Sequence, residues 1–231
     1  MVNYKIKQMI TAIILILFGW MMINNFLFTQ QLPNEKKVNQ TLKKKHINVY
    51  LFRHGETLYN KLYRETGKDP KLPDTLLTKK GHNQTKNMNN KISKMKFDLI
   101  LCSPMSRTLQ TAHNALSKEQ IKSIVINPYL TEPVGQILDL WKDPAYLKKY
   151  FPLINFEKLN NKSGIDFHEK MENHQSFSDR VGFVINQIKK LHVKNILIVG
   201  HQYFFSEMIK QLSGNDDPVY LKNANLFHIK I

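Results

Sequence analysis

The sequence lacks the cysteines that a disulfide or a sulfur-bound metal needs. Its 231 residues contain one cysteine, Cys102, which excludes an internal disulfide and a cysteine-based zinc site. Cys102 lies in an apolar run, so we expect a small buried residue rather than a catalytic thiol. The histidines outside the motifs described below form no pair at ligand spacing, and the sequence therefore predicts no metal site.

The sequence also lacks a linker rich in glycine, serine and proline, an internal repeat and a long low-complexity tract. A chain of 231 residues can bury one full core. We therefore expect one folded domain over residues 46–231. An N-terminal extension precedes it, with a short basic N-terminus (1–8), an apolar segment (9–28) and a polar, Lys-rich tether (29–45).

The apolar segment, 9–28, is long enough to cross a membrane, since about 20 apolar residues span a bilayer as a helix. We predict an N-terminal hydrophobic helix that acts as an uncleaved single-pass membrane anchor. A cleaved signal peptide and a soluble buried helix are the alternatives. The residues after Ile23 offer no small-x-small cleavage pattern, which favours the anchor. Lysines flank the segment on both sides, so the side of the membrane stays open.

Acidic residues are scarce, with 18 Asp and Glu against 34 Lys and Arg and a formal net charge of +16. Such a charge suits nucleic acid or an anionic membrane. The lysines are scattered, however, and no basic run is interleaved with aromatic residues, so we expect no nucleic-acid partner. Arginine is rarer still: Arg53, Arg64, Arg107 and Arg180 are the four. Because guanidinium binds phosphate bidentately, arginine at selected positions indicates phosphate recognition.

Short β-branched runs alternate with longer amphipathic segments along residues 46–231, which predicts an α/β domain with a largely parallel sheet. The predicted strands are Ile47–Phe52, Asp98–Leu101, Ser123–Ile126, Asn195–Val199 and Leu226–Ile231. The predicted helices are Thr78–Lys94, Met105–Leu116, Asp139–Tyr150, Ser178–His192 and Phe204–Leu212. Residues Pro152–Gln175 have weak periodicity and predict an irregular insertion.

Polar clusters follow three of the predicted strands at the point where each strand ends. They are 53–55 (Arg-His-Gly), 103–107 (Ser-Pro-Met-Ser-Arg) and 200–202 (Gly-His-Gln). The carboxyl ends of parallel strands meet at one edge of a sheet, and this edge is where α/β folds place their chemistry. A fourth element, 130–132 (Leu-Thr-Glu), follows the third strand.

The first cluster has the composition of a phosphate cradle. Arg53 and His54 leave the strand together, Gly55 permits close backbone approach, and Thr57 and Asn60 can donate hydrogen bonds. A single histidine after a strand would more often be a hydrogen-bonded core residue. The adjacent arginine and the second histidine-bearing strand end argue for a phosphate site instead.

Five motifs in this order resemble the histidine phosphatase superfamily, also called phosphoglycerate mutase-like. They are Arg-His-Gly-Glu-Thr (53–57), Leu-Thr-Lys-Lys-Gly (77–81), Ser-Pro-Met-Ser-Arg-Thr-Leu-Gln-Thr-Ala (103–112), Leu-Thr-Glu (130–132) and Gly-His (200–201). The match spans most of residues 46–231, and the first 45 residues have no counterpart in it. The resemblance implies a three-layer α/β/α domain around a largely parallel sheet.

The resemblance also implies a covalent mechanism without metal or cofactor. Neutral His54 would attack phosphorus and become a phosphohistidine. Arg53, Arg107 and His201 would hold the phosphoryl oxygens and stabilise their charge in the transition state. Glu132 would protonate the leaving oxygen and later accept a proton from water.

Further residues are expected to contribute to the site. Asp139 and Glu169 are the reserve candidates for the proton donor. Gln202 replaces the first of two glycines that often follow the late histidine in the family, and its backbone N–H can still reach phosphate. With Thr57 and Asn60, Gln202 completes the predicted substrate-binding set.

The predicted activity is that of a histidine acid-type phosphatase, a phosphoric monoester hydrolase. The substrate is a phosphorylated small molecule or a phosphoprotein, and the sequence leaves both the substrate and the oligomeric state open. A phosphoglycerate mutase-type transfer and a membrane-tethered module that binds a phosphorylated ligand without turnover are the alternatives. We expect specificity to reside in Asn60–Pro73 and Pro152–Gln175.

Overall fold

The computed structural model describes residues 46–133, 140–160, 164 and 172–231. The chain divides into two compact units, Met1–Lys44 and Lys45–Ile231, and only the second falls within the described residues. The predicted apolar helix over 9–28 and the tether over 29–45 therefore lie outside them. No helix in the described part of the chain is long and apolar enough to cross a membrane.

A five-stranded mixed sheet organises the domain, with the strand order β3-β2-β4-β1-β5. Strands β1 to β4 pair in parallel, and β5 runs antiparallel to β1 at the edge. All five predicted strands are present, and each end lies within one residue of its predicted position. Their bounds are β1 (Asn48–Arg53), β2 (Leu99–Cys102), β3 (Ile124–Ile126), β4 (Asn195–Gly200) and β5 (Leu226–Lys230).

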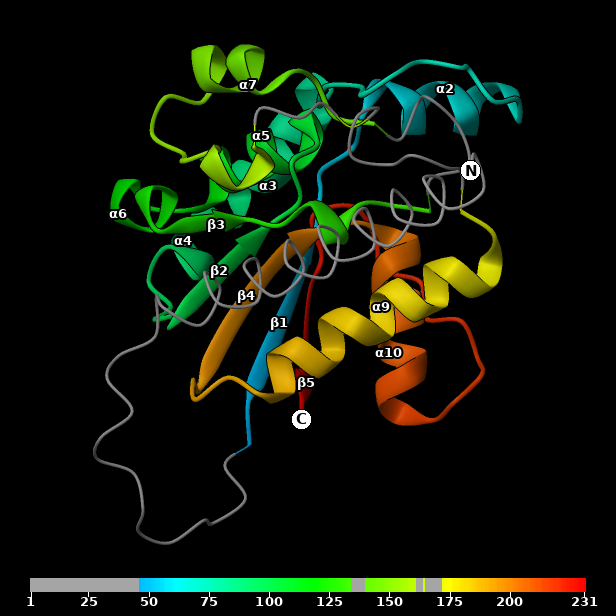
Figure 1. Ribbon diagram of the computed structural model, residues 1–231. Coiled ribbons are helices and arrows are strands. Elements are labelled where there is room, and N and C mark those ends of the chain that lie inside the picture. The colour runs from blue at the N-terminus through cyan, green and yellow to red at the C-terminus, as the bar shows by residue number, and fades with distance from the viewer. Residues whose placement is uncertain (1–45, 134–139, 161–163, 165–171) are drawn as a thin grey trace, which may run out of the picture. The chain divides into compact units, whose positions relative to one another are not determined.

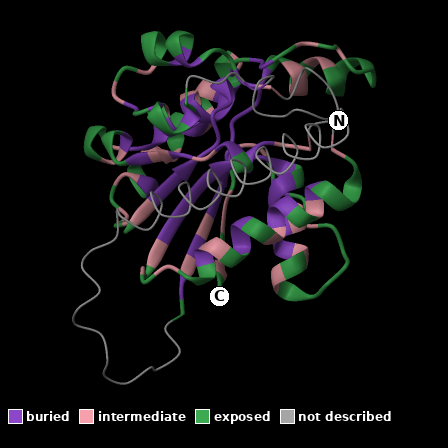
Figure 2. Ribbon diagram, viewed as in Figure 1, coloured by how far each residue is buried: buried purple, intermediate pink, exposed green. Residues whose placement is uncertain are grey.

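Helices cover both faces of this sheet (Figure 1). Side chains alternate across a strand, so Phe52 and Val199 enter one hydrophobic cluster, whereas Leu51 and Ile198 enter the other. The first cluster lies against α5 (Ser106–Ala115), and the second against α9 (His174–Lys189) and α10 (Gln202–Ser213). Strands β1 to β4 are accordingly buried over most of their length (Figure 2), as a sheet covered on two sides requires, whereas the edge strand β5 is partly exposed.

Shorter helical segments complete the domain. They are α2 (Leu58–Thr66), α3 (Lys79–Asn87), α4 (Asn89–Ile92), α6 (Lys118–Lys122), α7 (Pro144–Tyr150) and the 3-10 helices η2 (Pro128–Leu130) and η4 (Glu157–Leu159). The apolar periodicity of the sequence does not predict α2 or α6. Both are polar segments, and each begins at a capping box, with Thr57 and Ser117 as the N-cap residues. The capping bonds, rather than an apolar face, therefore determine where these helices begin.

Three predicted helices differ from the observed ones at their boundaries. The predicted helix Thr78–Lys94 divides at Met88, whose N–H bonds the Thr85 carbonyl in a tighter 3-10 turn. α7 begins at Pro144 rather than at residue 139, because Asp143 caps it and proline fits the first turn of a helix. α9 begins at His174, four residues earlier than predicted, where Asn173 forms a capping box.

Candidate active site

The carboxyl ends of the neighbouring strands β1 and β4 bring the two motif histidines together. The backbone N–H of His54 donates to the Gly200 carbonyl at 3.0 Å, and the ring centroids of His54 and His201 lie 5.4 Å apart. Arg107, in the first turn of α5, reaches the same place and donates from Nε to Nδ1 of His201 at 3.2 Å. The predicted convergence of the strand-end clusters is confirmed.

The His54 ring is a neutral imidazole that uses one of its two nitrogens, Nδ1, in a hydrogen bond to the backbone. Its Nδ1 lies 2.8 Å from the Gly55 carbonyl oxygen. A carbonyl only accepts, so Nδ1 carries the ring proton and Nε2 keeps its lone pair. Burial, and then the charges of Arg107 and Arg53, lower the pKa of His54 well below its ordinary value of 6.5. Near neutral pH, Nε2 is therefore unprotonated.

Arg53 is buried beside His54 with part of its guanidinium uncommitted. One terminal nitrogen donates to the Leu221 carbonyl at 2.5 Å, and Cζ lies 5.3 Å from the ring centroid of Tyr220. The buried Nε has no hydrogen-bond partner among the residues that the structure describes. A buried donor left unpaired costs about 1–3 kcal/mol, and a phosphoryl oxygen is an acceptor that would remove this cost.

His201 is fully buried, and both of its ring nitrogens are engaged. Nδ1 accepts from Arg107, so Nε2 carries the proton, and Nε2 lies 2.9 Å from the Ser103 hydroxyl oxygen. Burial, and then the charge of Arg107, lower the pKa of His201 well below its ordinary value of 6.5. His201 is therefore a neutral group that orients the Arg107 guanidinium.

Glu132 is half-buried, and its carboxylate lies at the N-terminus of α10, directly after His201. Its two oxygens accept the backbone N–H groups of Tyr203 at 3.2 Å and Phe204 at 3.1 Å. Carboxylates are favoured at this end of a helix. The reserve candidates, Asp139 and Glu169, lie outside the described residues.

Arg180 fixes the backbone that carries Glu132. Its terminal nitrogens donate to the carbonyl oxygens of Tyr129 at 2.6 Å, Thr131 at 3.0 Å and Glu132 at 3.1 Å. Its Nε and one terminal nitrogen also bond the two carboxylate oxygens of Glu172 at 2.6 and 2.7 Å. A planar guanidinium with every donor used restrains this segment strongly, so the position of Glu132 depends on Arg180.

Thr57 and Asn60 bond to each other. The Asn60 N–H donates to the Thr57 hydroxyl, and the Thr57 N–H donates to the Asn60 side-chain oxygen, both at 3.1 Å. Asn223 donates its side-chain amide to the same oxygen of Asn60 and to the His54 carbonyl, both at 3.2 Å. These residues thus support the His54 backbone, and their contact with substrate stays a prediction.

The Gln202 side chain is bonded to a segment near the C-terminus. Its amide donates to the Val219 carbonyl and accepts from the Leu221 N–H, both at 2.8 Å. The predicted contact between the Gln202 backbone N–H and phosphate is independent of these bonds and stays a prediction.

Gly55 lies in close contact with α3. A Cβ atom at Gly55 would come within 2.6 Å of the Gly81 carbonyl oxygen, and a Cβ at Gly81 would come within 2.0 Å of the Glu56 carbonyl oxygen. Both distances are far below contact distance, so glycine is required at both positions. The Leu-Thr-x-x-Gly motif therefore packs directly under the first motif.

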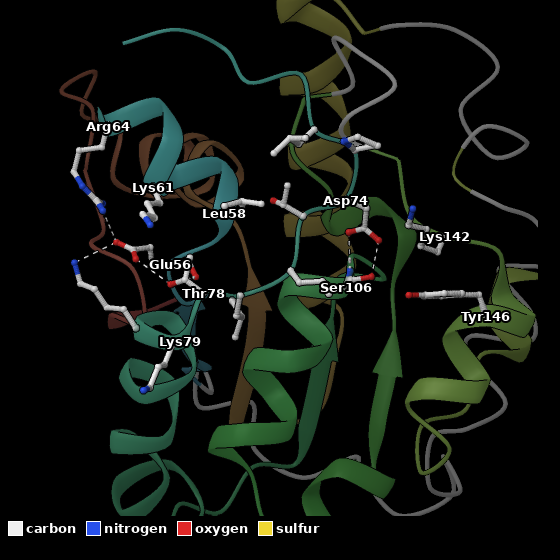
Figure 3. A pocket seen from close by; sticks show the side chains of 16 residues that line it. Glu56, Leu58, Lys61, Arg64, Asp74, Thr78, Lys79, Ser106, Lys142 and Tyr146 are labelled. Carbon is white, nitrogen blue, oxygen red and sulfur yellow. Dashed lines mark hydrogen bonds and ion pairs between the residues drawn. The ribbon is translucent and has the colours of Figure 1, made fainter. Parts of the chain in front are cut away.

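Figure 3 shows a cavity of about 850 Å³ whose lining includes neither His54 nor His201. Glu56 forms part of its wall, where it pairs with Arg64 at 2.7 Å and Lys80 at 3.2 Å and accepts from the Thr78 hydroxyl. None of the residues predicted to bind phosphate lines it. The cavity is lined by part of Asn60–Pro73, which the sequence predicts to determine specificity, and by residues from α5 and α7. Its lining includes Lys61, Arg64, Leu72, Pro73, Ser106, Lys142 and Tyr146.

Sequence reasoning missed several residues that shape the site. Ser103 belongs to the motif at 103–112 and Arg180 to the predicted helix Ser178–His192, but the sequence did not indicate what their side chains bind. Tyr220 and Asn223 belong to an irregular segment with no motif and no periodicity. No group of three or more metal-ligating side chains occurs in the described ranges.

Comparison with known proteins connects this geometry with a family. The chain is 31% identical over 175 residues to the adenosylcobalamin/alpha-ribazole phosphatase of Escherichia coli, covering 73% of this chain and 80% of the relative. It is 33% identical to a probable phosphoglycerate mutase of Erwinia tasmaniensis, but over 86 residues and 37% of this chain, or 38% of the relative.

A solved structure and a family model agree with the first of these relatives. The crystal structure of a putative alpha-ribazole-5'-P phosphatase from E. coli has a TM-score of 0.55 and 26% identity, and the match covers 79% of this chain and 89% of that one. The sequence model described as histidine phosphatase superfamily (branch 1) matches residues 49–228. The chain therefore belongs to the histidine phosphatase superfamily.

Proposed function

We propose that this protein hydrolyses phosphomonoesters through a phosphohistidine formed on His54. The observation that carries the proposal is the state of the His54 ring, which is neutral, has its Nδ1 proton on the Gly55 carbonyl and has two guanidinium groups close by. Such an imidazole directs the Nε2 lone pair at an electrophile in a cationic setting, which suits attack on a phosphate dianion.

The reaction proceeds in two steps. Nε2 of His54 forms a bond to phosphorus while the bond from phosphorus to the ester oxygen breaks, and Glu132 in its protonated form donates a proton to the departing oxygen. Water then attacks the phosphohistidine, Glu132 takes a proton from that water, and inorganic phosphate leaves. Arg53 and Arg107 stabilise the charge on the phosphoryl oxygens in both steps, and His201 holds the Arg107 guanidinium in place.

The low pKa of His54 supports activity in mildly acidic solution. The imidazole must be unprotonated to attack, and its lowered pKa keeps it so below pH 6.5. Protonation of His54 should therefore not limit kcat/KM until the pH is well below 6.5, whereas a fall near pH 6 reports the second ionisation of the substrate phosphate, whose pKa is about 6. This behaviour is that of an acid-type phosphatase.

Hydrolysis is favoured over mutase chemistry because the phosphatase relative matches a larger share of this chain than the mutase relative does. The phosphatase relative matches 73% of this chain and the mutase relative 37%. The name of the phosphatase relative suggests a phosphorylated small molecule as substrate.

A pocket that only binds a phosphorylated ligand, without turnover, is disfavoured, because the four residues that the proposed mechanism needs are all present: Arg53, His54, Arg107 and His201.

The test is to incubate the protein with a phosphomonoester and measure both free phosphate and acid-labile phosphate on the protein. Wild type should release phosphate and carry the label, and His54→Ala should do neither. Interconversion of 3-phosphoglycerate without net phosphate release would favour the mutase. Ligand binding by both proteins with no label on either would favour the binding module.

We also propose that residues 9–28 anchor the protein to a membrane as a single span, with 29–45 as the tether. The support is the apolar character of 9–28 and the lysines on both flanks. Protease protection of the intact chain in membrane vesicles tests the span and shows which side the domain faces. Release of a fragment that lacks the N-terminus would favour the cleaved signal peptide.

A further inference from the structure

Tyr220 is exposed, yet it lies on a guanidinium that the proposed mechanism uses. About 71% of the residue is exposed to solvent, while its ring centroid lies 5.3 Å from Cζ of Arg53. Cation–π contact of this kind holds a ring in place. An aromatic surface is thus presented to solvent directly beside a phosphate-binding side chain.

Hydrogen bonds on both sides of Tyr220 fix its backbone. The buried Gln202 amide bonds the Val219 carbonyl and the Leu221 N–H, each at 2.8 Å. The Leu221 carbonyl in turn accepts from Arg53. The placement of the Tyr220 ring over Arg53 is therefore set by Gln202, which follows His201 directly at the start of α10.

The direction of the reaction brings the leaving group toward this ring. In-line displacement places the ester oxygen opposite Nε2 of His54, and His54 is buried, so the rest of the substrate must project outward from the phosphate. Arg53, which binds the phosphoryl oxygens in the proposed mechanism, has Tyr220 on its exposed side. A leaving group on a phosphate bound by Arg53 would then project toward the ring that covers the same guanidinium.

We propose that Tyr220 determines specificity by stacking against the leaving group, and that the preferred substrates are phosphomonoesters whose alcohol carries an aromatic ring. Aromatic groups stack favourably, whereas a flexible alkyl chain gains less from a planar surface. Gln202 is the positioning residue that holds this ring over Arg53. The inference rests on the proposed phosphatase activity.

The test compares benzyl phosphate with butyl phosphate. Both are esters of primary alcohols, so the ratio of their kcat/KM values isolates recognition of the ring. Wild type should prefer benzyl phosphate by about five- to tenfold. Tyr220→Ala and Tyr220→Leu should bring the ratio close to one, and Tyr220→Phe should preserve it. Tyr150→Ala, which removes an exposed tyrosine from α7, is the matched control and should keep the wild-type ratio.

Gln202→Met tests the positioning role. It removes both amide hydrogen bonds but leaves the Tyr220 ring intact, so the ratio should fall toward that of Tyr220→Ala, with KM for benzyl phosphate raised. A thermal melt monitored by circular dichroism establishes that each variant is folded. A role in stability alone would lower the melting temperature and leave the ratio at its wild-type value.

Failure of the Tyr220 inference can be told apart from failure of the proposed phosphatase activity. If wild type hydrolyses both esters with equal kcat/KM, or if Tyr220→Ala and Tyr220→Leu keep the wild-type ratio, the inference is wrong and the proposed function stands. If wild type releases phosphate from neither ester and acquires no phosphohistidine, the proposed function fails and the inference fails with it.

Discussion

The strand ends of β1 and β4 each deliver a buried histidine, and the two histidines differ in one respect. Burial and neighbouring arginines lower the pKa of both. His54 uses Nδ1 on the Gly55 carbonyl, whereas His201 uses one nitrogen on Arg107 and the other on Ser103. Burial and charge are therefore alike at the two rings, and the proposed roles of nucleophile and orienting group rest on the hydrogen-bond partners of the ring nitrogens.

The largest expected effect comes from removing the nucleophile. His54→Ala should lower kcat by about 10⁴-fold or more, because no other group can form the covalent intermediate. His201→Ala should cost less, about 10²- to 10³-fold, because it removes only the bond that orients Arg107 for charge stabilisation. Steady-state kinetics with benzyl phosphate measures both. Equal losses in the two variants, or a greater loss in His201→Ala, would reverse the assignment of the two histidines.

The bond between Arg107 and His201 gives the second prediction. Arg107→Lys keeps the charge but loses the planar fork, so Nε can no longer hold His201 while the terminal nitrogens bind phosphate. We expect kcat/KM to fall by about 10²-fold. Arg64→Lys is the control, because Arg64 pairs with Glu56 and is outside the predicted phosphate-binding set, and it should retain activity. Full activity of Arg107→Lys would show that point charge alone suffices.

Ser103 gives a smaller effect that sharpens the same comparison. Ser103→Ala removes the partner of Nε2 of His201, which leaves a buried ring N–H unsatisfied and the ring less fixed. We expect kcat to fall about tenfold, with the phosphohistidine still forming on His54. Ser123→Ala, at an exposed hydroxyl at the end of α6, provides the reference. An increase in KM alone, with kcat unchanged, would contradict an orienting role.

The smallest effect concerns stability. Both histidines are neutral when folded but bind a proton below pH 6.5 when unfolded. Stability should therefore be lost as the pH falls below 6.5, by about 1 kcal/mol for each histidine at one pH unit below that value. Urea denaturation at pH 7.5 and 5.5 measures this loss, and His201→Asn should reduce it. A loss of equal size in His201→Asn would show that other groups cause it.

The sequence predicted the residues that meet at strand ends and missed those that support them. His54, Arg107 and His201 follow apolar runs, and parallel strands must bring their carboxyl ends to one edge. Arg180 acts through backbone carbonyls, which carry no sequence signature. Tyr220 lies in an irregular segment, so neither periodicity nor a motif could place it over Arg53.

The fold shows the same division. The alternation of apolar residues identified all five strands, but it carries no information on direction, and the antiparallel pairing of β5 with β1 needed the structure. Helix α2 escaped prediction because its face is mostly polar, and its start depends on the reciprocal bonds of Thr57 and Asn60. Local side-chain bonds, rather than hydrophobic pattern, set the boundaries that were wrong.

The most direct test of the central claim is to locate the phosphoryl group in the trapped intermediate. The protein is quenched at alkaline pH after brief reaction with a phosphomonoester, the phosphopeptide is identified by mass spectrometry, and the bonded nitrogen is assigned by ³¹P NMR. The account predicts phosphate on Nε2 of His54, since Nδ1 is bonded to the Gly55 carbonyl. Phosphate on His201, or on Nδ1 of His54, would contradict it.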